Sequence, residues 1–226
     1  HILENFFPEY KNEEIQNMKN LIFKKSVENA FKIFVDTERT KNEIIKLYNC
    51  QDHKLVIQPF TPFLPKFYKD NFGKIDYKKK IKELGLFGEK FIFYPANFWA
   101  HKNHNYILDS LKILMNNKCD IKVVFTGSQK SNFQVIKDKI NKLNLQKHIK
   151  IFLFLKEEEI IALYQHCLAI VMPTFVARST LPLYESFFFQ KPIFYSKGIL
   201  DEQLEKFTIP INLDDPNDLS NKIVNL

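Results

Sequence analysis

The stretch PTFVARSTLPLYESFFFQK, residues 173–191, lies between two short apolar runs. The run before it, LAIVM at 168–172, has the length and composition of a buried strand, and residues 192–195 predict a second strand. Between them the sequence predicts a loop and then a helix that begins at Pro182. Proline fits the first helical position because its missing N–H would be unpaired there anyway. The stretch and its flanks therefore predict one strand–loop–helix–strand unit.

The loop ahead of this helix is a candidate anion site. Residues 178–181 lie where free backbone N–H groups and the positive end of the helix dipole favour negative charge. Arg178 could bind a phosphate bidentately, and Glu185, expected in the first helical turn, could accept a hydrogen bond from a ligand hydroxyl. Such a site suits a nucleoside diphosphate, whose ribose carries hydroxyls. An ordinary turn with a solvated glutamate explains the same pattern.

Further along the chain, in both directions, apolar strands alternate with amphipathic helices. Strands are expected at 90–94, 121–125 and 148–155, and helices at 77–84, 103–115, 132–143 and 157–166. Such alternation predicts a parallel sheet covered by helices on both faces. Ligands of these sheets bind beyond the carboxyl ends of the strands. The loops expected there are 95–102, 126–131, 155–158 and 173–181.

The first part of the chain predicts a separate, smaller unit. Helices are expected at 13–30 and 38–47, and short strands at 31–35 and 54–58. Three prolines follow, at positions 59, 62 and 65, which stiffen the chain and argue against a helix there. We therefore expect one domain over residues 1–58 and a second over residues 59–226.

Composition narrows the class of protein. With 226 residues, 45% of them hydrophobic, the chain can form a sizeable core, and no apolar run approaches the roughly 20 residues of a membrane-spanning helix. Three widely spaced cysteines exclude a complete set of paired disulfides and fit a reducing compartment. No secretory signal pattern opens the chain. Neither a G-x-G-x-x-G motif nor a P-loop is present, which argues against dinucleotide and kinase-like triphosphate sites.

The net charge of +7 comes from lysines, since Arg39 and Arg178 are the only arginines. Solvated helix faces account for most of these lysines, and weak attraction to an anionic membrane surface is the alternative. The sequence shows no basic stripe with interleaved aromatic residues, so a nucleic-acid partner is not expected.

The chain resembles retaining glycosyltransferases of the two-lobed GT-B type, family 4, in four segments: FYPANFWAHKNH (93–104), VVFTGS (123–128), KIFLFLKEEEIIALYQHCLAIVMPT (150–174) and STLPLYESFFFQKPIFYS (179–196). FFPEY (6–10) and VDTERTKNEII (35–45) resemble the end of that family's amino-terminal lobe. The resemblance implies a Rossmann-like parallel sheet with helices on both faces over 59–226, as the nucleotide-sugar lobe. Residues 1–58 would be the remnant of the acceptor-side lobe.

The same resemblance implies an activity and a site. The activity is transfer of a sugar from a nucleoside diphosphate sugar to a glycan or lipid-linked acceptor with retention, in surface polysaccharide synthesis. The resemblance implies no metal or cofactor. It implies a cytoplasmic location, either free or at the inner face of the membrane. Lys102 and Glu185 are implied as catalytic, Phe154, Leu155 and Lys156 as base-binding. The donor and diphosphate residues implied are Asn97, Lys102, Gly127, Arg178, Ser179, Thr180, Leu181 and Glu185.

The sequence departs from the family's pattern in three places. One of them is the strand near Leu153, which lacks the glycine often found there. The first glutamate of the family's pair falls at Ala177, and its glycine-rich run is replaced by Arg178-Ser179-Thr180. A lobe that binds nucleotide or sugar without turnover is therefore the alternative. The chain alone is expected to bind nucleotide without transferring sugar.

Several residues of the first candidate loop have two interpretations. Lys102 is expected to open a helix, where a cation is disfavoured unless an anion compensates. His101 and His104 are a weak metal pair without a third ligand, and hydrogen bonding within the loop is preferred. Trp99 suits either the wall of a cleft or stacking on a sugar.

Overall fold

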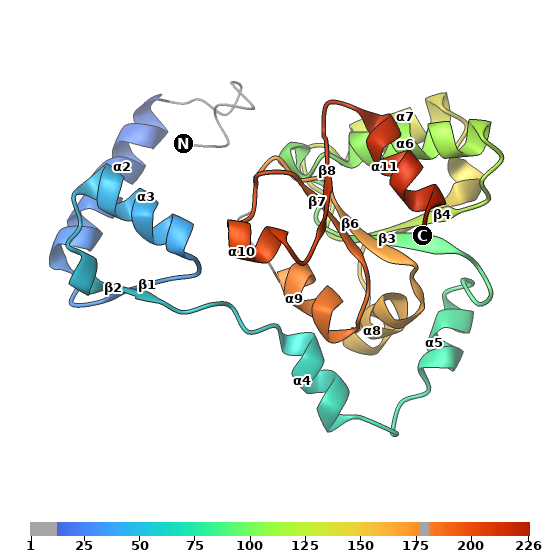
Figure 1. The fold of residues 1–226 in the computed structure, drawn as a ribbon, viewed down its shortest axis with the longest axis horizontal. Coiled ribbons are helices and arrows are strands. Elements are labelled where there is room, and N and C mark those ends of the chain that lie inside the picture. The colour runs from blue at the N-terminus through green and yellow to red at the C-terminus, as the bar shows by residue number, and fades with distance from the viewer. Residues whose placement is uncertain (1–12, 177–180) are drawn as a thin grey trace. The chain divides into compact units, whose positions relative to one another are not determined.

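A computed structural model describes residues 13–176 and 181–226 (Figure 1). The chain divides into two compact units, His1–Thr61 and Pro62–Leu226. The division falls after Thr61, slightly later than the position expected from the three prolines.

The described part of unit 1, residues 13–61, contains a two-stranded parallel sheet and two α-helices. Its elements are α2 (Glu13–Asn29), β1 (Ile33–Val35), α3 (Glu38–Tyr48), the 3₁₀ turn η2 (Asp52–Lys54) and β2 (Leu55–Ile57). Thr37 caps α3, with its hydroxyl oxygen accepting the Thr40 N–H at 3.1 Å. Among the described side chains, the buried core of this unit is Val35, Cys50 and Leu55.

Unit 2 is built on a six-stranded sheet in the order β5-β4-β3-β6-β7-β8, with every neighbouring pair parallel. In the register of the central pair, Ile92 lies opposite Ala169 and Phe93 opposite Ile170. The central strands are almost wholly buried, as expected when helices cover both faces of a parallel sheet. The strands are β3 (Phe91–Pro95), β4 (Lys122–Thr126), β5 (Ile149–Phe152), β6 (Ala169–Met172), β7 (Ile193–Ser196) and β8 (Ile209–Ile211).

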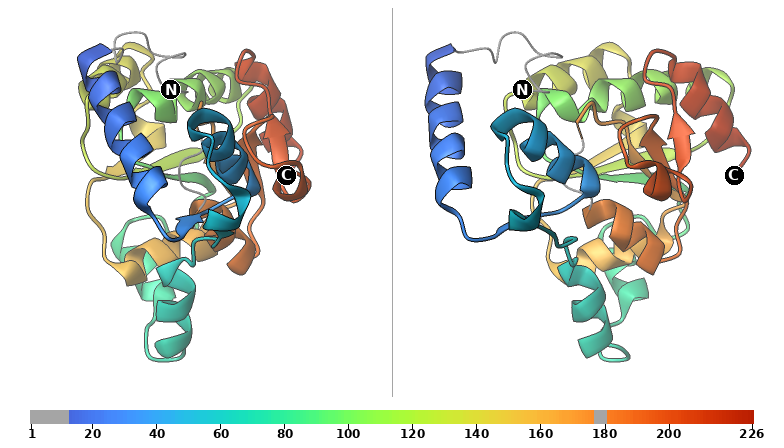
Figure 2. Two further views of the ribbon diagram at one scale, coloured as in Figure 1. Left: turned by 90° about the vertical axis from the view of Figure 1, so that its left-hand side faces the viewer. Right: turned by 60° about the vertical axis from the view of Figure 1, so that its left-hand side comes forward.

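Helices cover the two faces of this sheet in separate layers (Figures 1 and 2). One layer contains α6 (His104–Asn116), α7 (Phe133–Lys142) and α11 (Pro216–Val224), with α6 packed on both neighbours. The other contains α4 (Phe63–Asp70), α5 (Tyr77–Glu83), α8 (Glu157–His166) and α9 (Leu181–Phe188). The remaining short elements are α10 (Glu202–Glu205) and the 3₁₀ turns η3 (Ala100–Lys102) and η4 (Gln146–His148). The α/β class with a parallel sheet and helices on both faces is confirmed.

Two sequence expectations about local structure are wrong. The proline cluster does not exclude a helix, because α4 begins at Phe63 with Pro62 as its N-cap. Pro65 then falls in the first turn, where a missing N–H costs no intrahelical hydrogen bond. The strand expected at 148–155 is shorter, because the ladder with β4 ends at the pair Thr126 and Phe152. No helix in the described parts of the chain is long and apolar enough to cross a membrane.

Candidate functional site

The order of the strands singles out one position in the sheet. From β3 the chain proceeds outward through β4 and β5, and from β6 it proceeds outward the other way through β7 and β8. The helices that follow β3 and β6, α6 and α9, lie in opposite layers. Open parallel sheets bind ligands at such a switch point, beyond the carboxyl ends of the two strands. The topology therefore directs attention to the loops after β3 and β6.

These two loops are joined at one backbone oxygen. The His101 carbonyl, in the loop after β3, accepts the Phe175 N–H at 3.0 Å. The same oxygen lies 3.2 Å from the hydroxyl of Thr174, a fully buried residue that follows β6. The Thr174 hydroxyl donates to the Val176 carbonyl at 2.8 Å, the shorter of these two contacts, and this hydrogen bond shapes its own loop. The two loops are thus held side by side at the switch point.

Lys102 follows His101 in the loop after β3, but its position relative to α6 differs from the one predicted. It ends the 3₁₀ turn η3, and Asn103 follows with φ of 53°, so α6 begins only at His104. The left-handed Asn103 separates the turn from the helix, and the expectation that Lys102 opens the helix is wrong. Its backbone is fixed by Tyr94 of β3, whose buried hydroxyl donates to the Lys102 carbonyl at 2.7 Å. The half-exposed lysine therefore stands just ahead of the α6 N-terminus.

Asn97 and Gly127 lie together where the loops after β3 and β4 meet. The Asn97 side-chain oxygen accepts the Ser128 N–H at 2.7 Å, and the Phe98 N–H donates to the Ser128 carbonyl at 3.1 Å. Gly127 has φ of 144°, and a Cβ there would lie 2.5 Å from the Ala96 carbonyl oxygen. Only glycine allows this approach of the two backbones. The described contacts of both residues thus order the loops after β3 and β4.

The three residues implied to bind the base lie apart from Lys102, at the end of the outer strand β5. Phe154 is 86% exposed. Lys156 is the N-cap residue of α8, and its backbone N–H donates a hydrogen bond of 2.7 Å to the Glu159 carboxylate. Since β4 separates β5 from β3, the strand ends are roughly 10 Å apart. The structure therefore places Phe154, Leu155 and Lys156 at the same edge of the sheet as Lys102, two strands away.

Glu185 is buried, and it has a protein partner that the sequence did not reveal. Because α9 begins at Leu181, Glu185 is in the second helical turn and not the first. Its Oε2 accepts a hydrogen bond of 2.6 Å from the hydroxyl of Tyr164 on α8. Burial raises the pKa of the Glu185 carboxyl, and the Tyr164 hydrogen bond opposes this rise. Tyr164 is fixed by the ring of Phe93 of β3 at 5.2 Å, so sheet and helix together orient the carboxylate.

His104 is fully buried at the start of α6, between the rings of Phe98, Tyr94 and Phe125. Burial lowers its pKa from 6.5 to about 3, the charge of Lys102 acts in the same direction, and the Ala96 backbone opposes both. The imidazole is therefore neutral at physiological pH. Within residues 13–176 and 181–226, no group of three histidine, cysteine or acidic side chains is placed to hold a metal.

The remaining predicted residues concern the loop that follows Val176. Arg178, Ser179 and Thr180, together with Ala177, lie outside the described residues. Leu181 was expected in the loop, but it is the first residue of α9, because the helix begins one position before Pro182. The structural supports Tyr94, Tyr164 and Thr174 were missed. The sequence carried only a weak signal for them, a hydroxyl within an otherwise apolar element.

Comparison with known proteins gives one family. The family model described as glycosyl transferases group 1 matches residues 76–209, more than half of the chain and nearly all of the sheet. A search of curated proteins finds no match to this chain.

Several solved structures share the fold. HepE from Anabaena, solved with UDP and glucose, has a TM-score of 0.74 at 14% identity, covering 96% of this chain and 58% of its own. A glycosyltransferase from Rickettsia africae has a TM-score of 0.72 at 19% identity, covering 90% and 56%. Sucrose-phosphate synthase from Thermosynechococcus elongatus has a TM-score of 0.72 at 17% identity, covering 96% and 54%.

The three structures agree with the family match on architecture. This chain spans less than two thirds of the length of each, so it corresponds to part of a GT-B protein. At these low identities the likeness shows the fold alone, whereas the family model covers the strands and loops of the switch point. The chain belongs to the group 1 glycosyl transferase family.

Proposed function

We propose that this chain is the nucleotide-sugar-binding part of a glycosyltransferase. The enzyme would move a sugar from a nucleoside diphosphate sugar to a glycan or lipid-linked acceptor. The observation that carries the proposal is the pair of loops joined at the His101 carbonyl, which holds Lys102 beside the end of β6. Family membership supports it, and so does HepE, a structural neighbour solved with UDP and glucose.

In this proposal the parts of the donor are arranged along one edge of the sheet. The diphosphate would lie between Lys102 and the N-terminus of α9, where a cation and a helix dipole favour an anion. The base would lie against residues 154–156 at the end of β5. From β6 to β5 there are three strand spacings, roughly 14 Å, comparable with the length of an extended nucleoside diphosphate. In this arrangement Glu185 receives the ribose hydroxyls through Oε1, because Tyr164 holds Oε2.

The chemistry needs stabilisation of a leaving group. As the bond to the sugar breaks, negative charge grows on the departing diphosphate. A preorganised cation and backbone dipoles aimed at that charge lower the barrier. Lys102 would supply the cation, and no metal or cofactor is required by this scheme. We further propose that transfer proceeds with retention, as in family 4, and serves surface polysaccharide synthesis.

The proposal also assigns the two units. Residues 59–226 would be the nucleotide-sugar lobe, and residues 1–58 the end of the acceptor-side lobe. Because the solved neighbours have additional chain beyond the part matched, the acceptor would meet residues outside this sequence. We therefore expect this chain alone to bind the donor nucleotide without transferring sugar.

A ligand screen tests the proposal directly. UDP, GDP and ADP, each paired with its nucleoside, would be added to the chain while thermal unfolding is followed. A ligand that binds only the native state raises the melting temperature, so one diphosphate should produce a clear increase. If no nucleoside diphosphate raises the melting temperature at millimolar concentration, the proposed function is wrong.

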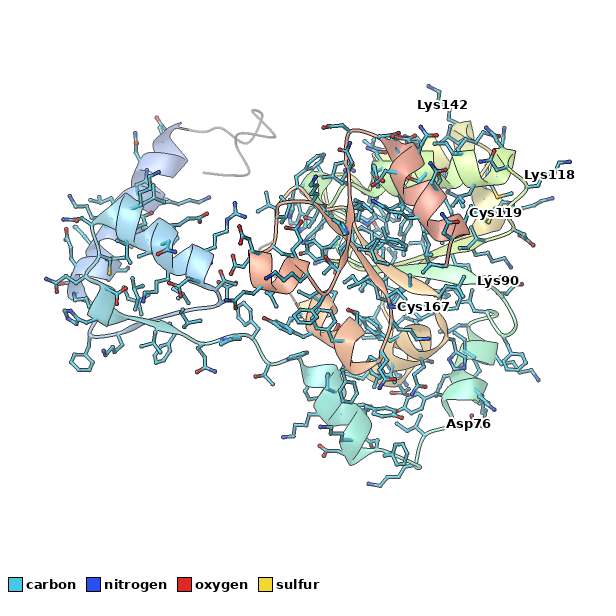
Figure 3. The ribbon with its side chains drawn as sticks, viewed as in Figure 1. Asp76, Lys90, Lys118, Cys119, Lys142 and Cys167 are labelled. Carbon is cyan, nitrogen blue, oxygen red and sulfur yellow. The ribbon has the colours of Figure 1, made fainter. Side chains whose placement is uncertain are left out.

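Lys102→Ala then tests the seat of the diphosphate. It should weaken binding of the diphosphate identified in the screen by a few kcal/mol at most, because water screens a partly exposed ion pair. Binding of the corresponding nucleoside should barely change. Isothermal titration of both ligands checks this, with Lys142→Ala on α7 as the control (Figure 3). Equal losses for both ligands would remove Lys102 from the site.

A further inference from the structure

The positive charge of this protein is unevenly distributed along the chain. Residues 1–61 contain nine basic and nine acidic residues, so unit 1 contributes nothing to the net charge of +7. Residues 62–90 alone contain eight lysines and four acidic residues, a net charge of +4. The much longer remainder, residues 91–226, contributes only +3. The segment that precedes the sheet of unit 2 therefore carries more than half of the net charge.

This segment forms α4, α5 and the loop between them, which we call the α4–α5 surface. Both helices pack on α8, so their other sides face solvent in the outer part of one helix layer (Figures 1 and 2). Packing fixes which residues face inward: Leu64 on α4 and Ile81 on α5 are buried. The exposed lysines of this surface are Lys66, Lys69, Lys74, Lys78, Lys79 and Lys82.

Most of this charge is not neutralised within the protein. Lys80 is the exception, with its ammonium 3.6 Å from Glu83 and 3.5 Å from Glu158. In the described part of the chain, no carboxylate lies within 4.0 Å of the ammonium groups of Lys78, Lys79 or Lys82. The exposed side of α5 thus presents three ammonium groups that have no carboxylate partner among the described residues.

Exposed phenylalanines accompany the lysines. Phe72, in the loop between α4 and α5, is 71% exposed, and its ring meets Tyr68 edge-on at 5.7 Å. That loop is the part of unit 2 farthest from the α6 and α7 layer (Figure 1). Phe87, just after α5, is 62% exposed. Large apolar rings at an exposed loop among lysines combine the two attractions that hold proteins at an anionic bilayer.

We propose that the α4–α5 surface binds the face of an anionic lipid bilayer, with Phe72 entering the headgroup region. Lysine ammonium groups attract lipid phosphates as point charges, and the charge of the surface is complementary to them. A nucleic-acid partner fits less well, because this segment contains no arginine for base edges. The inference depends on residues 62–90 only and stands whether or not the switch point binds a nucleotide.

Vesicle sedimentation of the 226-residue chain tests the proposal. Vesicles of phosphatidylcholine with about one third phosphatidylglycerol would be compared with vesicles of phosphatidylcholine alone, at 0.1 M salt, where charge screening is moderate. The chain should bind the anionic vesicles and not the neutral ones. Each lysine near such a surface is worth roughly a factor of five, so the triple variant Lys78→Gln, Lys79→Gln, Lys82→Gln should lose at least about tenfold in partitioning. Phe72→Ser should also reduce partitioning.

A matched variant separates this surface from net charge. Lys118→Gln, Lys142→Gln, Lys147→Gln removes the same charge near the ends of α6 and α7, on the other layer; Figure 3 labels Lys118 and Lys142. This control should leave partitioning within about twofold of the unaltered chain, and melting temperatures confirm that both triples are folded. No binding to anionic vesicles, or equal losses in the two triples, would overturn the proposal. Complete release of the vesicle-bound chain by a short single-stranded RNA at equal phosphate concentration would assign the surface to nucleic acid instead.

Discussion

The two units of this protein use the same parallel strand pairing but bury their side chains to very different extents. In unit 2, Phe93 and Phe125 are completely buried within a six-stranded sheet. In unit 1, Phe31 is 88% and Phe34 is 67% exposed beside a two-stranded sheet. The two strands and two helices described in unit 1 leave much of the parallel pair uncovered, whereas six strands with two helix layers enclose the sheet of unit 2. Burial in this chain therefore follows sheet size more than local composition.

This difference explains where a site can be built. A binding residue needs a side chain that is held by packing and hydrogen bonds. Unit 2 supplies such support to Glu185 through Tyr164, and to the Lys102 backbone through Tyr94. The exposed apolar side chains of α2, such as Leu21 and Phe23, have the character of a surface that packs against further protein. That character supports the proposal that unit 1 is the end of a larger lobe.

The largest expected difference between the units is their response to acid. The pKa of buried His104 is about 3 in the folded protein and about 6.5 when unfolded, so the unfolded state takes up the proton first. The contribution of His104 to the free energy of unfolding is fully present above pH 6.5. It is lost as the pH decreases toward 3, and the loss amounts to roughly 5 kcal/mol at most. Urea unfolding of unit 2 at several pH values measures this. In unit 1 the histidine among the described residues, His53, is exposed to solvent and not buried as His104 is.

His104→Phe provides the control for this pH dependence. Phenylalanine retains an aromatic ring against Phe98, which stacks on His104 at 4.5 Å, and it does not titrate. The variant should show a shallower loss of stability between pH 6.5 and 4. An unchanged slope would mean that another group is responsible.

Truncation of a phenylalanine side chain to alanine should affect the stability of the two units differently. Phe93→Ala should destabilise unit 2 by about 3–5 kcal/mol, because the site is fully buried and a large cavity results. Phe34→Ala, at a strand position of unit 1 that is 67% exposed, should cost less than about 1 kcal/mol. Denaturant unfolding of both variants gives the two free energies. Similar losses of stability would show that Phe34 is covered in solution, and that the two units do not differ in burial as the structure indicates.

An effect of intermediate size is expected on ligand binding, which the proposal assigns to unit 2. Glu185→Ala should weaken binding of a nucleoside diphosphate by about 1–3 kcal/mol, the cost of a lost hydrogen bond to a charged group. Tyr164→Phe should have a smaller effect, because the carboxylate stays but loses its 2.6 Å donor and its pKa rises further. Glu202→Ala on α10 is the matched control. Calorimetry that shows full affinity in a folded Glu185→Ala variant would exclude Glu185 from the site.

The smallest effect is expected at the surface of unit 1. Phe31→Ser should change the free energy of unfolding by about 0.5 kcal/mol or less, since the side chain is 88% exposed. It should also reduce self-association at high concentration, which light scattering measures. A loss of stability above about 2 kcal/mol would show that Phe31 is covered by protein in solution.

The sequence predicted the regular parts of this fold better than its site. Alternating apolar runs identified the strands of unit 2, because a strand that is buried on both faces must be apolar throughout. The order of those strands was not predictable from the runs. The structure shows that β3 pairs with β6, with Ile92 opposite Ala169, and this pairing makes the loops after the two strands neighbours. Lys102 was misplaced because a single left-handed residue, Asn103, ends the turn before α6. The bond between Tyr164 and Glu185 joins residues 21 positions apart on different helices, so no local pattern could reveal it.

The central pairing of β3 with β6 also constrains how the protein is made. During synthesis β3, β4 and β5 can pair as soon as each crossover helix is complete, but the other edge of β3 must wait for β6. That wait spans α6, β4, α7, β5 and α8. An unpaired apolar strand edge is a template for pairing with other chains. The nascent half-sheet is thus most prone to aggregate just before Ala169 leaves the ribosome, and slowing translation between β5 and β6 should lower the yield of folded protein.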